Sequence, residues 1–512
     1  MNTQSREVNS IRNFVVGAIS QFFFLFLNLV TKTVFIKTLG TEFLGINGLF
    51  TNIFVLLSFA EFGIGSVMVY SLYDPISKED TEKITAIYRF FKNIYIIMSV
   101  IMMFIGVLII PILKFMVNTE IALTNISVYY ILFLISITIS NMYIYKAHLI
   151  LADQKKYIVS LYQFIFECIA LILQIIFLLL TEDYTHYLII FLGKNILYSF
   201  FIGRKVNRLY SFLKDNTINN ILDIKEKQKI MNKIGEVFIY RFARSLLTGT
   251  DNILISILVG TVWVGYYSNY DLIIVGVLSL VTTFYSGISA SVGNLIAKER
   301  VENQYKIFNI IQVINCWISG FTTTCLYILF QDFITLWIGK EYLLHWKIVI
   351  VIVFNYYLIC TRNSIKVFRM ASGMFEKVKY IMSIAAILNI FLSILMGKLF
   401  GLFGILLATS ITALSTYYWY EAKLLMESKF GCSLKIYLKG QIKGFSLTII
   451  SIFITSLFVS LINEVTISTF IIKVAICLVI PNVFYFIALK REEEFQVIST
   501  IIVRTYKKII NR

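Results

Sequence analysis

The feature that most constrains this chain is a series of apolar segments, each long enough to cross a lipid bilayer as a helix. A hydrocarbon core about 30 Å thick is crossed by roughly 20 residues of α-helix. The chain holds only 3 prolines among its 512 residues, so long helices are permitted almost everywhere. Scanning for such segments predicts about fourteen spans, at 14–36, 44–72, 88–113, 124–148, 157–180, 187–203, 236–259, 264–296, 307–330, 347–368, 379–397, 402–424, 445–462 and 468–489.

Composition favours an all-α integral membrane protein. Hydrophobic residues make up 58% of the chain, charged residues make up 15%, and the mean hydropathy is +0.80. Soluble domains are about half apolar and about a quarter charged. The first segment, from Phe14 to Ile36, is longer than the apolar part of a signal peptide, so we expect it to be the first membrane span.

The formal net charge of +17 is spread unevenly over the predicted connections. Alternate connections carry most of the 46 Lys and Arg residues, and the largest basic cluster lies at 204–235. The opposite connections hold only Lys37, Lys114, Lys340, Lys347 and Lys398. Positive residues concentrate in the cytoplasmic loops of membrane proteins. The alternation therefore predicts a multi-pass protein of the cell membrane with both termini in the cytoplasm.

The two halves of the chain also resemble each other. When the sequence is shifted by 220 residues against itself, Gly40, Thr41 and Gly45 are matched with Gly260, Thr261 and Gly265. This match predicts that spans 1–6 and 7–12 form two six-helix lobes related by a pseudo-twofold, an architecture of transporters. The expected domains are an N-terminal lobe at 1–208, a basic cytoplasmic linker at 209–235, a C-terminal lobe at 236–425, two extra spans at 426–490 and a cytoplasmic tail at 491–512.

Polar side chains form stripes on the first, second, seventh and eighth spans, whereas spans 9 and 11 show nothing comparable. Ionisable residues inside a bilayer line a cavity or pair with one another. We therefore expect a hydrated central cavity between the two halves. The candidate substrate-binding residues are Asn28, Lys32, Glu61, Arg241, Arg244, Asp251 and Asp271.

Several of these charges also have a structural interpretation. Lys32 and Arg241 lie near the ends of their spans, where a long side chain can extend its charge to the interface. Glu61 and Asp251 can serve as counter-ions of Lys or Arg. In contrast, Arg241 and Arg244 lie one turn apart, and paired guanidinium groups suit bidentate binding of a phosphate or diphosphate. Three further intramembrane charges are interpreted as structural or interfacial, namely Glu167, Lys194 and Arg362.

Several kinds of catalytic and energy-coupling site have no counterpart in the sequence. The chain has no G-x-x-x-x-G-K-[ST] loop for nucleotide binding. It has no H-E-x-x-H motif, and its 6 cysteines do not follow the spacing of a metal site. We expect neither a cofactor nor a metal. The predicted outer loops are too short for a catalytic domain, so a transporter is expected rather than an enzyme.

Five stretches together resemble a known family. They are the opening at 9–14, the turn at 40–45, the glycine-rich stretch at 61–65, and the segments at 250–252 and 265–270. These stretches resemble Wzx-type polysaccharide repeat-unit flippases. That family belongs to the polysaccharide transporters of the multidrug/oligosaccharidyl-lipid/polysaccharide exporter superfamily, with the multidrug extruders and the peptidoglycan-precursor flippase.

The resemblance implies a V-shaped fold of two lobes around a cavity that opens alternately to each side. It implies a polyprenyl-diphosphate-linked oligosaccharide as substrate. Lys32, Arg241 and Arg244 would then meet the diphosphate or acidic sugars. Spans 13 and 14 would lie beside the lobes, where they could support the lipid tail.

The resulting prediction is a flippase that moves lipid-linked oligosaccharide repeat units across the cytoplasmic membrane for cell-surface polysaccharide synthesis. Its expected partners are that substrate, membrane lipid, and a polysaccharide polymerase and glycosyltransferases, with no nucleic acid. One alternative is a cation-coupled exporter of amphipathic small molecules on the same fold, whose cavity should be rich in acidic residues. The other is a membrane-embedded glycosyl or acyl transferase, which needs a catalytic carboxylate or histidine in a loop.

Overall fold

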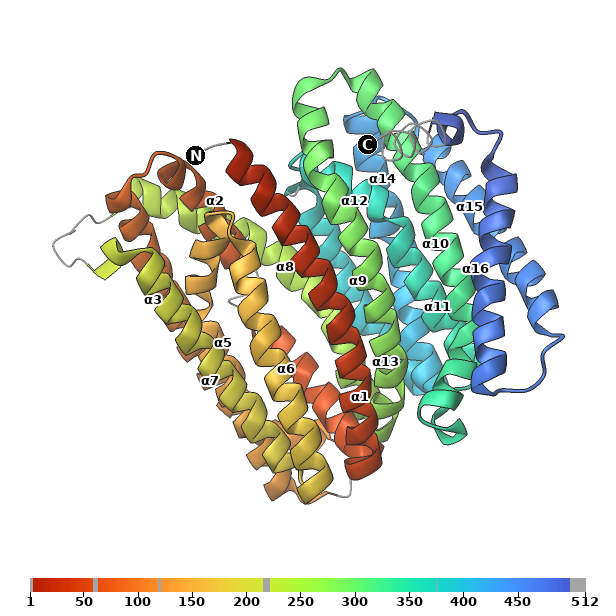
Figure 1. The fold of residues 1–512 in the computed structure, drawn as a ribbon, viewed down its shortest axis with the longest axis horizontal. Helices are drawn as coiled ribbons and strands as arrows, with labels where there is room; N and C mark the ends of the chain where they lie inside the picture. The colour runs from red at the N-terminus through yellow and green to blue at the C-terminus, as the bar shows by residue number, and fades with distance from the viewer. Residues whose placement is uncertain (1–2, 59–62, 118–120, 215–221, 375, 498–512) are drawn as a thin grey trace. The chain divides into compact units, whose positions relative to one another are not determined.

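The fold is known from a computed structural model that describes residues 3–58, 63–117, 121–214, 222–374 and 376–497 (Figure 1). Nearly all of this described part is helical, and none of it is in a β-strand. The helices are α1 (Thr3–Leu57), α2 (Ile64–Ser77), α3 (Thr81–Ile109), η2 (Ile110–Ile112), α4 (Leu113–Met116), α5 (Leu123–Ala152), α6 (Lys156–Thr181), α7 (Tyr184–Leu209), η3 (Ser211–Lys214), α8 (Ile224–Leu258), α9 (Thr261–Lys298), α10 (Val301–Trp337), η4 (Lys340–Tyr342), α11 (Trp346–Thr361), α12 (Asn363–Ala371), α13 (Glu376–Ser415), α14 (Tyr417–Ser428), α15 (Leu434–Val459) and α16 (Ile467–Leu489).

The helices confirm the predicted class of an all-α membrane protein. Among the residues that the structure describes, 11 continuous helical segments are long and apolar enough to cross a membrane. Each predicted span coincides with one helix, with part of one, or with two or three consecutive helices. The segments Phe26–Leu57 and Lys377–Ser428 each hold two predicted spans. The prediction of about fourteen spans therefore agrees with the helices observed.

Two glycines separate the spans inside α1 and α13. Gly40 has a φ of 81° and Gly401 has a φ of 60°, in the left-handed region that favours glycine. The chain reverses at Gly401. This reversal is shown by the 3.2 Å hydrogen bond between the side chains of Asn389 and Thr409, which lie on either side of the glycine. Each of these glycines therefore ends one span and allows the next to begin.

Aromatic contacts show the same reversal at Gly40. Phe35 and Phe43, on either side of the glycine, both pack on the ring of Tyr184 at the start of α7. Further along the chain, Phe54 stacks on Phe133 within α5. The second segment of α1 therefore leads away from the membrane face where the first segment ends.

Besides the span at 88–113, which continues from α3 into η2 and the first residue of α4, three predicted spans are divided between two α-helices. The span at 44–72 is divided because α1 ends at Leu57 and α2 begins after Gly63, which has a φ of 110°. The span at 347–368 is divided between α11 and α12 at Arg362. The span at 402–424 is divided between α13 and α14 at Thr416. Hydropathy does not register these breaks, because the side chains on both sides remain apolar.

By internal contacts the chain divides into two compact units, Met1–Gly265 and Tyr266–Arg512. This division lies later in the chain than the predicted linker at 209–235. Helix α8 begins at Ile224, inside that predicted linker, and it packs on α1 and α2. The contact-based first unit therefore contains α8 as well as the six predicted N-terminal spans.

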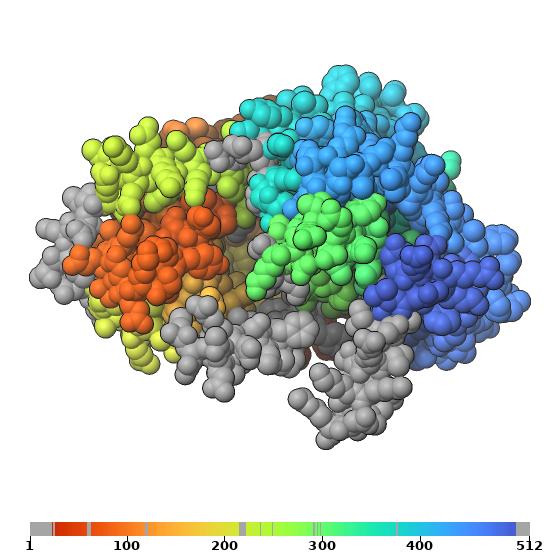
Figure 2. Space-filling view, turned by 90° about the horizontal axis from the view of Figure 1, so that it is seen from above, coloured from red at the N-terminus to blue at the C-terminus, as the bar shows by residue number. Residues whose placement is uncertain are grey.

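The first unit has a hydrophobic core near the ends of α2, α3, α5 and α7. Ile84 and Ile87 of α3 are buried there with Leu149 of α5, and Ile230 and Ile234 of α8 join the same cluster. Figure 2 shows this end of the unit, where orange residues of α2 and α3 lie beside yellow-green residues of α7 and α8. This core fixes α8 on the N-terminal helices.

The repeated glycine motif makes a reciprocal contact within the first unit. A Cβ atom at Gly45 would overlap the carbonyl oxygen of Thr261, and a Cβ atom at Gly265 would overlap the carbonyl oxygen of Thr41. Farther along, Gly249 packs against Leu56. Each motif thus supplies a glycine onto which the backbone of the other packs. The matching residues that revealed the internal repeat are the residues that touch.

In the second unit, α15 and α16 pack directly on α10. Lys473 of α16 forms a 2.6 Å ion pair with Asp332 of α10, and the exposed fractions of their side chains are only 6% and 19%. Trp317 of α10 donates a hydrogen bond to Asn482 of α16 at 2.8 Å. These two helices, expected as an addition beside the lobes, are therefore held in the unit by polar contacts along their length.

A chain of hydrogen bonds crosses the interior of the second unit. Tyr285 of α9 donates to Asn315 of α10 at 2.6 Å, and Asn315 donates to the carbonyl of Thr361 at 2.7 Å. The hydroxyl groups of Thr361 and Tyr418 share a hydrogen bond, and Tyr418 donates to Gln441 at 3.0 Å. Five helices are joined in this way. Helix α10 thus carries a polar stripe that the sequence analysis missed, formed by the buried residues Asn315, Ser319 and Thr323.

A buried charge cluster lies next to this chain of hydrogen bonds. Arg362 donates to the carboxylate of Glu421 at 2.8 Å, and Arg369 approaches the same carboxylate at 3.7 Å. The side chains of Glu421 and Arg369 are each only 1% exposed. The interpretation of Arg362 as a structural charge agrees with this pairing.

The reciprocal glycine contact predicts that Gly45→Ala destabilises the protein. The added Cβ would overlap a backbone oxygen, and overpacking of this kind costs about 1–3 kcal/mol. The matched control is Gly193→Ala in α7, where a Cβ would have no neighbour within 4 Å. The measurement is the thermal unfolding midpoint of each purified variant in detergent. Equal midpoints for the two variants would contradict the proposed packing role of Gly45.

The charge cluster predicts that Glu421→Gln is strongly destabilising. Removing one partner of a buried ion pair costs about 3–5 kcal/mol, because the remaining charges lose their compensation. Asp74→Asn is the control, since Asp74 pairs with Lys78 where both side chains are about two-thirds exposed, at 67% and 69%. Thermal unfolding should separate the two variants clearly, and similar midpoints would show that Glu421 is not the required counter-ion.

Candidate functional site

The candidate residues on α1 lie in its first segment. Asn28 and Lys32 are half-buried, and Thr31 between them is buried and donates to the carbonyl of Leu27 at 2.9 Å. The segment ends at Gly40, so Lys32 lies about 12 Å of helix from the reversal, taking 1.5 Å per residue. Both candidate side chains are therefore carried by the first segment of α1, away from its end.

Helix α8 carries the two candidate arginines on an exposed face. Arg241 and Arg244 are exposed, whereas Ser245 and Asn252 on the neighbouring part of the helix are buried. Asp251 is half-buried. The predicted stripe of polar residues is therefore divided between an exposed basic part and a buried part that packs on the rest of the unit.

Of the remaining candidates, Glu61 lies outside the described residues. Asp271 is half-buried in α9 and belongs to the second unit. The other candidates, Asn28, Lys32, Arg241, Arg244 and Asp251, all belong to the first unit. They are carried by α1 and α8, two helices that pack on each other.

A histidine that the sequence analysis did not select lies beside the arginine face. The ring of His148 of α5 stacks on Tyr95 of α3 at 5.9 Å, and a Cβ atom at Gly65 of α2 would overlap it. Arg241 lies within electrostatic reach of His148, and the Nδ1 atom of His148 is buried without a hydrogen-bond partner among the described residues. A sequence signal for this contact was Gly65, because its lack of a side chain leaves room for the ring of His148.

Two other intramembrane charges form an ion pair in the first unit. Lys194 of α7 approaches Glu167 of α6 at 2.8 Å, and the ammonium lies 4.6 Å from the ring centre of Phe191. Glu167 lies on the same face of α6 as the buried residues Leu171 and Gln174. This pairing agrees with the interpretation of both charges as structural.

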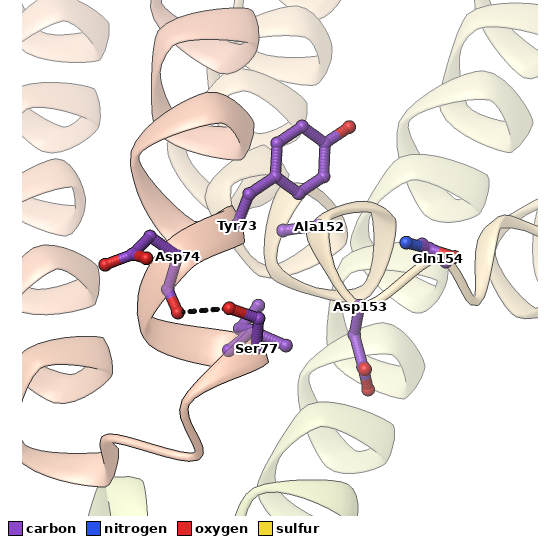
Figure 3. A pocket seen from close by; sticks show the side chains of 7 residues that line it. Tyr73, Asp74, Ser77, Ala152, Asp153 and Gln154 are labelled. Atoms are coloured by element: carbon purple, nitrogen blue, oxygen red, sulfur yellow. Dashed lines mark hydrogen bonds between the residues drawn. The ribbon is translucent and has the colours of Figure 1, made fainter. Parts of the chain in front are cut away.

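A separate pocket of about 390 Å³ lies at the ends of α2 and α5 (Figure 3). Asp74 and Ser77 come from α2, and Asp153 and Gln154 come from the turn after α5. Ser77 donates to the carbonyl oxygen of Asp74 at 2.8 Å. None of the predicted site residues lines this pocket, which lies at the helix ends rather than along a span.

The buried carboxylate of this pocket has its own partners. Tyr210 donates to Asp153 at 2.8 Å, and Lys155 forms an ion pair with the same carboxylate at 2.6 Å. Burial, together with the negative charge of Asp153, raises the pKa of the Tyr210 hydroxyl. The phenol therefore stays protonated and can keep donating its hydrogen bond. These contacts tie the end of α7 to the turn after α5.

Comparison by sequence finds no matching family model and no matching curated protein. Comparison of structures finds several transporters. A structure of the lipid II flippase MurJ in an inward closed conformation has a TM-score of 0.69 at 20% identity, covering 93% of this chain and 99% of that chain.

Two further similar structures are transporters. An inward-facing multidrug resistance MATE family transporter of the MOP superfamily has a TM-score of 0.64 at 14% identity, covering 82% of this chain and 94% of that one. A MOP superfamily transporter from Pyrococcus furiosus has a TM-score of 0.58 at 12% identity, covering 86% and 96%. At these identities the likeness establishes the fold. The chain is therefore a multi-pass membrane protein with the fold of the MATE and MurJ transporters of the MOP superfamily.

Proposed function

We propose that this protein is a flippase that moves a polyprenyl-diphosphate-linked oligosaccharide across the cytoplasmic membrane by alternating access. The observation that carries the proposal is the pair of exposed arginines, Arg241 and Arg244, one turn apart on α8. Arg244 lies 14 residues before the helix ends at Leu258, which is about 21 Å at 1.5 Å per residue. That distance is less than the roughly 30 Å thickness of a hydrocarbon core.

An exposed guanidinium at this depth can bind an anion that approaches it from outside the helix. Placing an arginine at the centre of a bilayer is costly on every scale of membrane insertion. A diphosphate has the complementary problem, since an ion transferred into a medium of low dielectric constant loses tens of kcal/mol of solvation. Two forked guanidinium groups can take a diphosphate bidentately. Arg241 and Arg244 are therefore suited to carry the anionic head group while the polyprenyl tail stays in lipid.

The half-buried side chains on the first unit support the same substrate class. Lys32 on α1 adds a third cation, and Asn28 adds an amide that can bind sugar hydroxyls. The similarity in fold to a lipid II flippase supports transport of a lipid-linked substrate. In this proposal both termini lie in the cytoplasm, and glycosyltransferases and a polysaccharide polymerase act before and after the transport step.

A cation-coupled exporter of small amphipathic molecules is the second candidate, since a multidrug resistance MATE transporter shares the fold. Such an exporter of cationic drugs is expected to present acidic groups to its substrate. The exposed pair on α8 is basic instead. The charge of that pair therefore favours an anionic substrate.

Deleting the gene should trap lipid-linked oligosaccharide on the inner leaflet and remove the corresponding surface polysaccharide. The measurement is extraction of lipid-linked oligosaccharides from the membrane, with surface polysaccharide quantified in parallel. Restoring the gene on a plasmid is the control. Normal polysaccharide combined with increased sensitivity to cationic drugs would instead establish the exporter.

The proposal also predicts that Arg244→Ala lowers export about tenfold or more, because a charge-assisted hydrogen bond contributes about 1.5–3 kcal/mol. Arg244→Lys should restore only part of the activity, since an ammonium cannot bind bidentately. The control is Arg300→Ala, at an exposed arginine before α10. Surface polysaccharide is measured in the deletion strain at matched protein levels in the membrane. Full export by Arg244→Ala would exclude this residue from the substrate path.

A further inference from the structure

We propose that α3, α5 and α7 form a binding site for the phosphate of an anionic membrane lipid, centred on Lys146 and Lys92. This site is separate from the arginine face of α8. Helix α5 packs on both α3 and α7 in the first unit (Figure 1). Lys146 belongs to α5 and Lys92 to α3.

The ammonium of Lys146 lies directly on the backbone of α7. A Cβ atom at Gly203 would be only 2.6 Å from its Nζ atom, so the absence of a side chain at Gly203 makes room for the charge. The same Nζ atom lies 4.7 Å from the ring centre of Tyr143, one turn earlier on α5. The ammonium is thus held in place by a glycine surface and an aromatic ring.

Neither lysine has an acidic partner among the residues that the structure describes. Lys146 is half-buried, and within the part of the chain that the structure describes neither Lys146 nor Lys92 forms an ion pair with a carboxylate. Lys92 lies within electrostatic reach of Lys146, so the two positive charges repel each other. A partly buried cation beside another cation is unfavourable unless an anion joins them. The missing component of this cluster is therefore a negative charge.

The depth of Lys146 in the membrane indicates which molecule supplies the negative charge. Lys146 and Gly203 each lie 6 residues before the end of their helix, which is about 9 Å at 1.5 Å per residue. Helix α5 has 30 residues and is therefore about 45 Å long, so each end extends several ångströms beyond a hydrocarbon core of about 30 Å. The backbone of Lys146 consequently lies near the edge of the hydrocarbon core, where a lysine side chain can extend its ammonium toward the level of lipid phosphates.

Apolar side chains continue from this cluster toward the middle of the membrane. Ile97 and Val100 of α3 are more than half exposed, at 56% and 64%, and Leu197 and Phe200 of α7 are about half exposed. Acyl chains can lie along these surfaces while the phosphate meets the two lysines. Basic pockets between membrane helices bind anionic head groups in this way. The geometry fits one phospholipid molecule with a net negative charge.

The test uses the purified full-length protein and compares phosphatidylglycerol with phosphatidylcholine. Gly203→Ala is the most informative variant, because its methyl group displaces the ammonium without changing the charge of the protein. Lys146→Gln removes the charge itself. Lys439→Gln, at an exposed lysine of α15, is the matched control.

Bound phosphatidylglycerol is measured by native mass spectrometry after delipidation and titration with defined lipid. We expect the wild-type protein and Lys439→Gln to prefer phosphatidylglycerol, and both Gly203→Ala and Lys146→Gln to bind it about fivefold more weakly. Equal binding by all four proteins, or equal binding of the two lipids by the wild-type protein, would overturn the proposal. Inorganic phosphate is included as a competitor, and displacement of the lipid by millimolar phosphate would overturn it in favour of a free-anion site.

Discussion

The structure depends on the need to compensate every polar group that lies within the membrane. Water is absent from the hydrocarbon core, so backbone hydrogen bonds must be made inside each helix. The same need governs side chains. Lys473 of α16 pairs with Asp332 of α10. Arg362, at the junction between α11 and α12, pairs with Glu421 of α14. These pairs join residues far apart in the sequence and fix which helices are neighbours.

Two groups of cations in the first unit suit anionic molecules outside the chain. The arginines of α8 are exposed within the length of a predicted span, and Lys146, which lies on α7 at Gly203, is near the edge of the hydrocarbon core. Both groups are cationic, so both suit anions. The two groups differ in their depth in the membrane, and so do their proposed roles. A transported head group must cross the hydrocarbon core, whereas a resident lipid keeps its phosphate at the interface.

The predicted site was only partly accessible to sequence reasoning. Helical periodicity grouped Arg241 and Arg244 on one face, and the structure leaves both exposed. The polar residues Ser245 and Asn252 on the neighbouring part of the same helix are buried. Periodicity gives the direction of a side chain around its own helix axis, but it contains no information about which helix lies opposite. For the same reason the sequence analysis did not place His148 beside Arg241, and it did not detect the polar stripe of α10.

The sequence by itself determined the class of the protein, the positions of its apolar segments and the turn at Gly40. These properties follow from local quantities, namely the length of apolar segments and the freedom of glycine at positive φ. Only the tertiary structure decided the helix breaks near Gly63 and at Arg362, the packing of α15 and α16 on α10, and the reciprocal contact of Gly45 and Gly265. Those features depend on contacts between distant segments, which hydropathy and periodicity do not record.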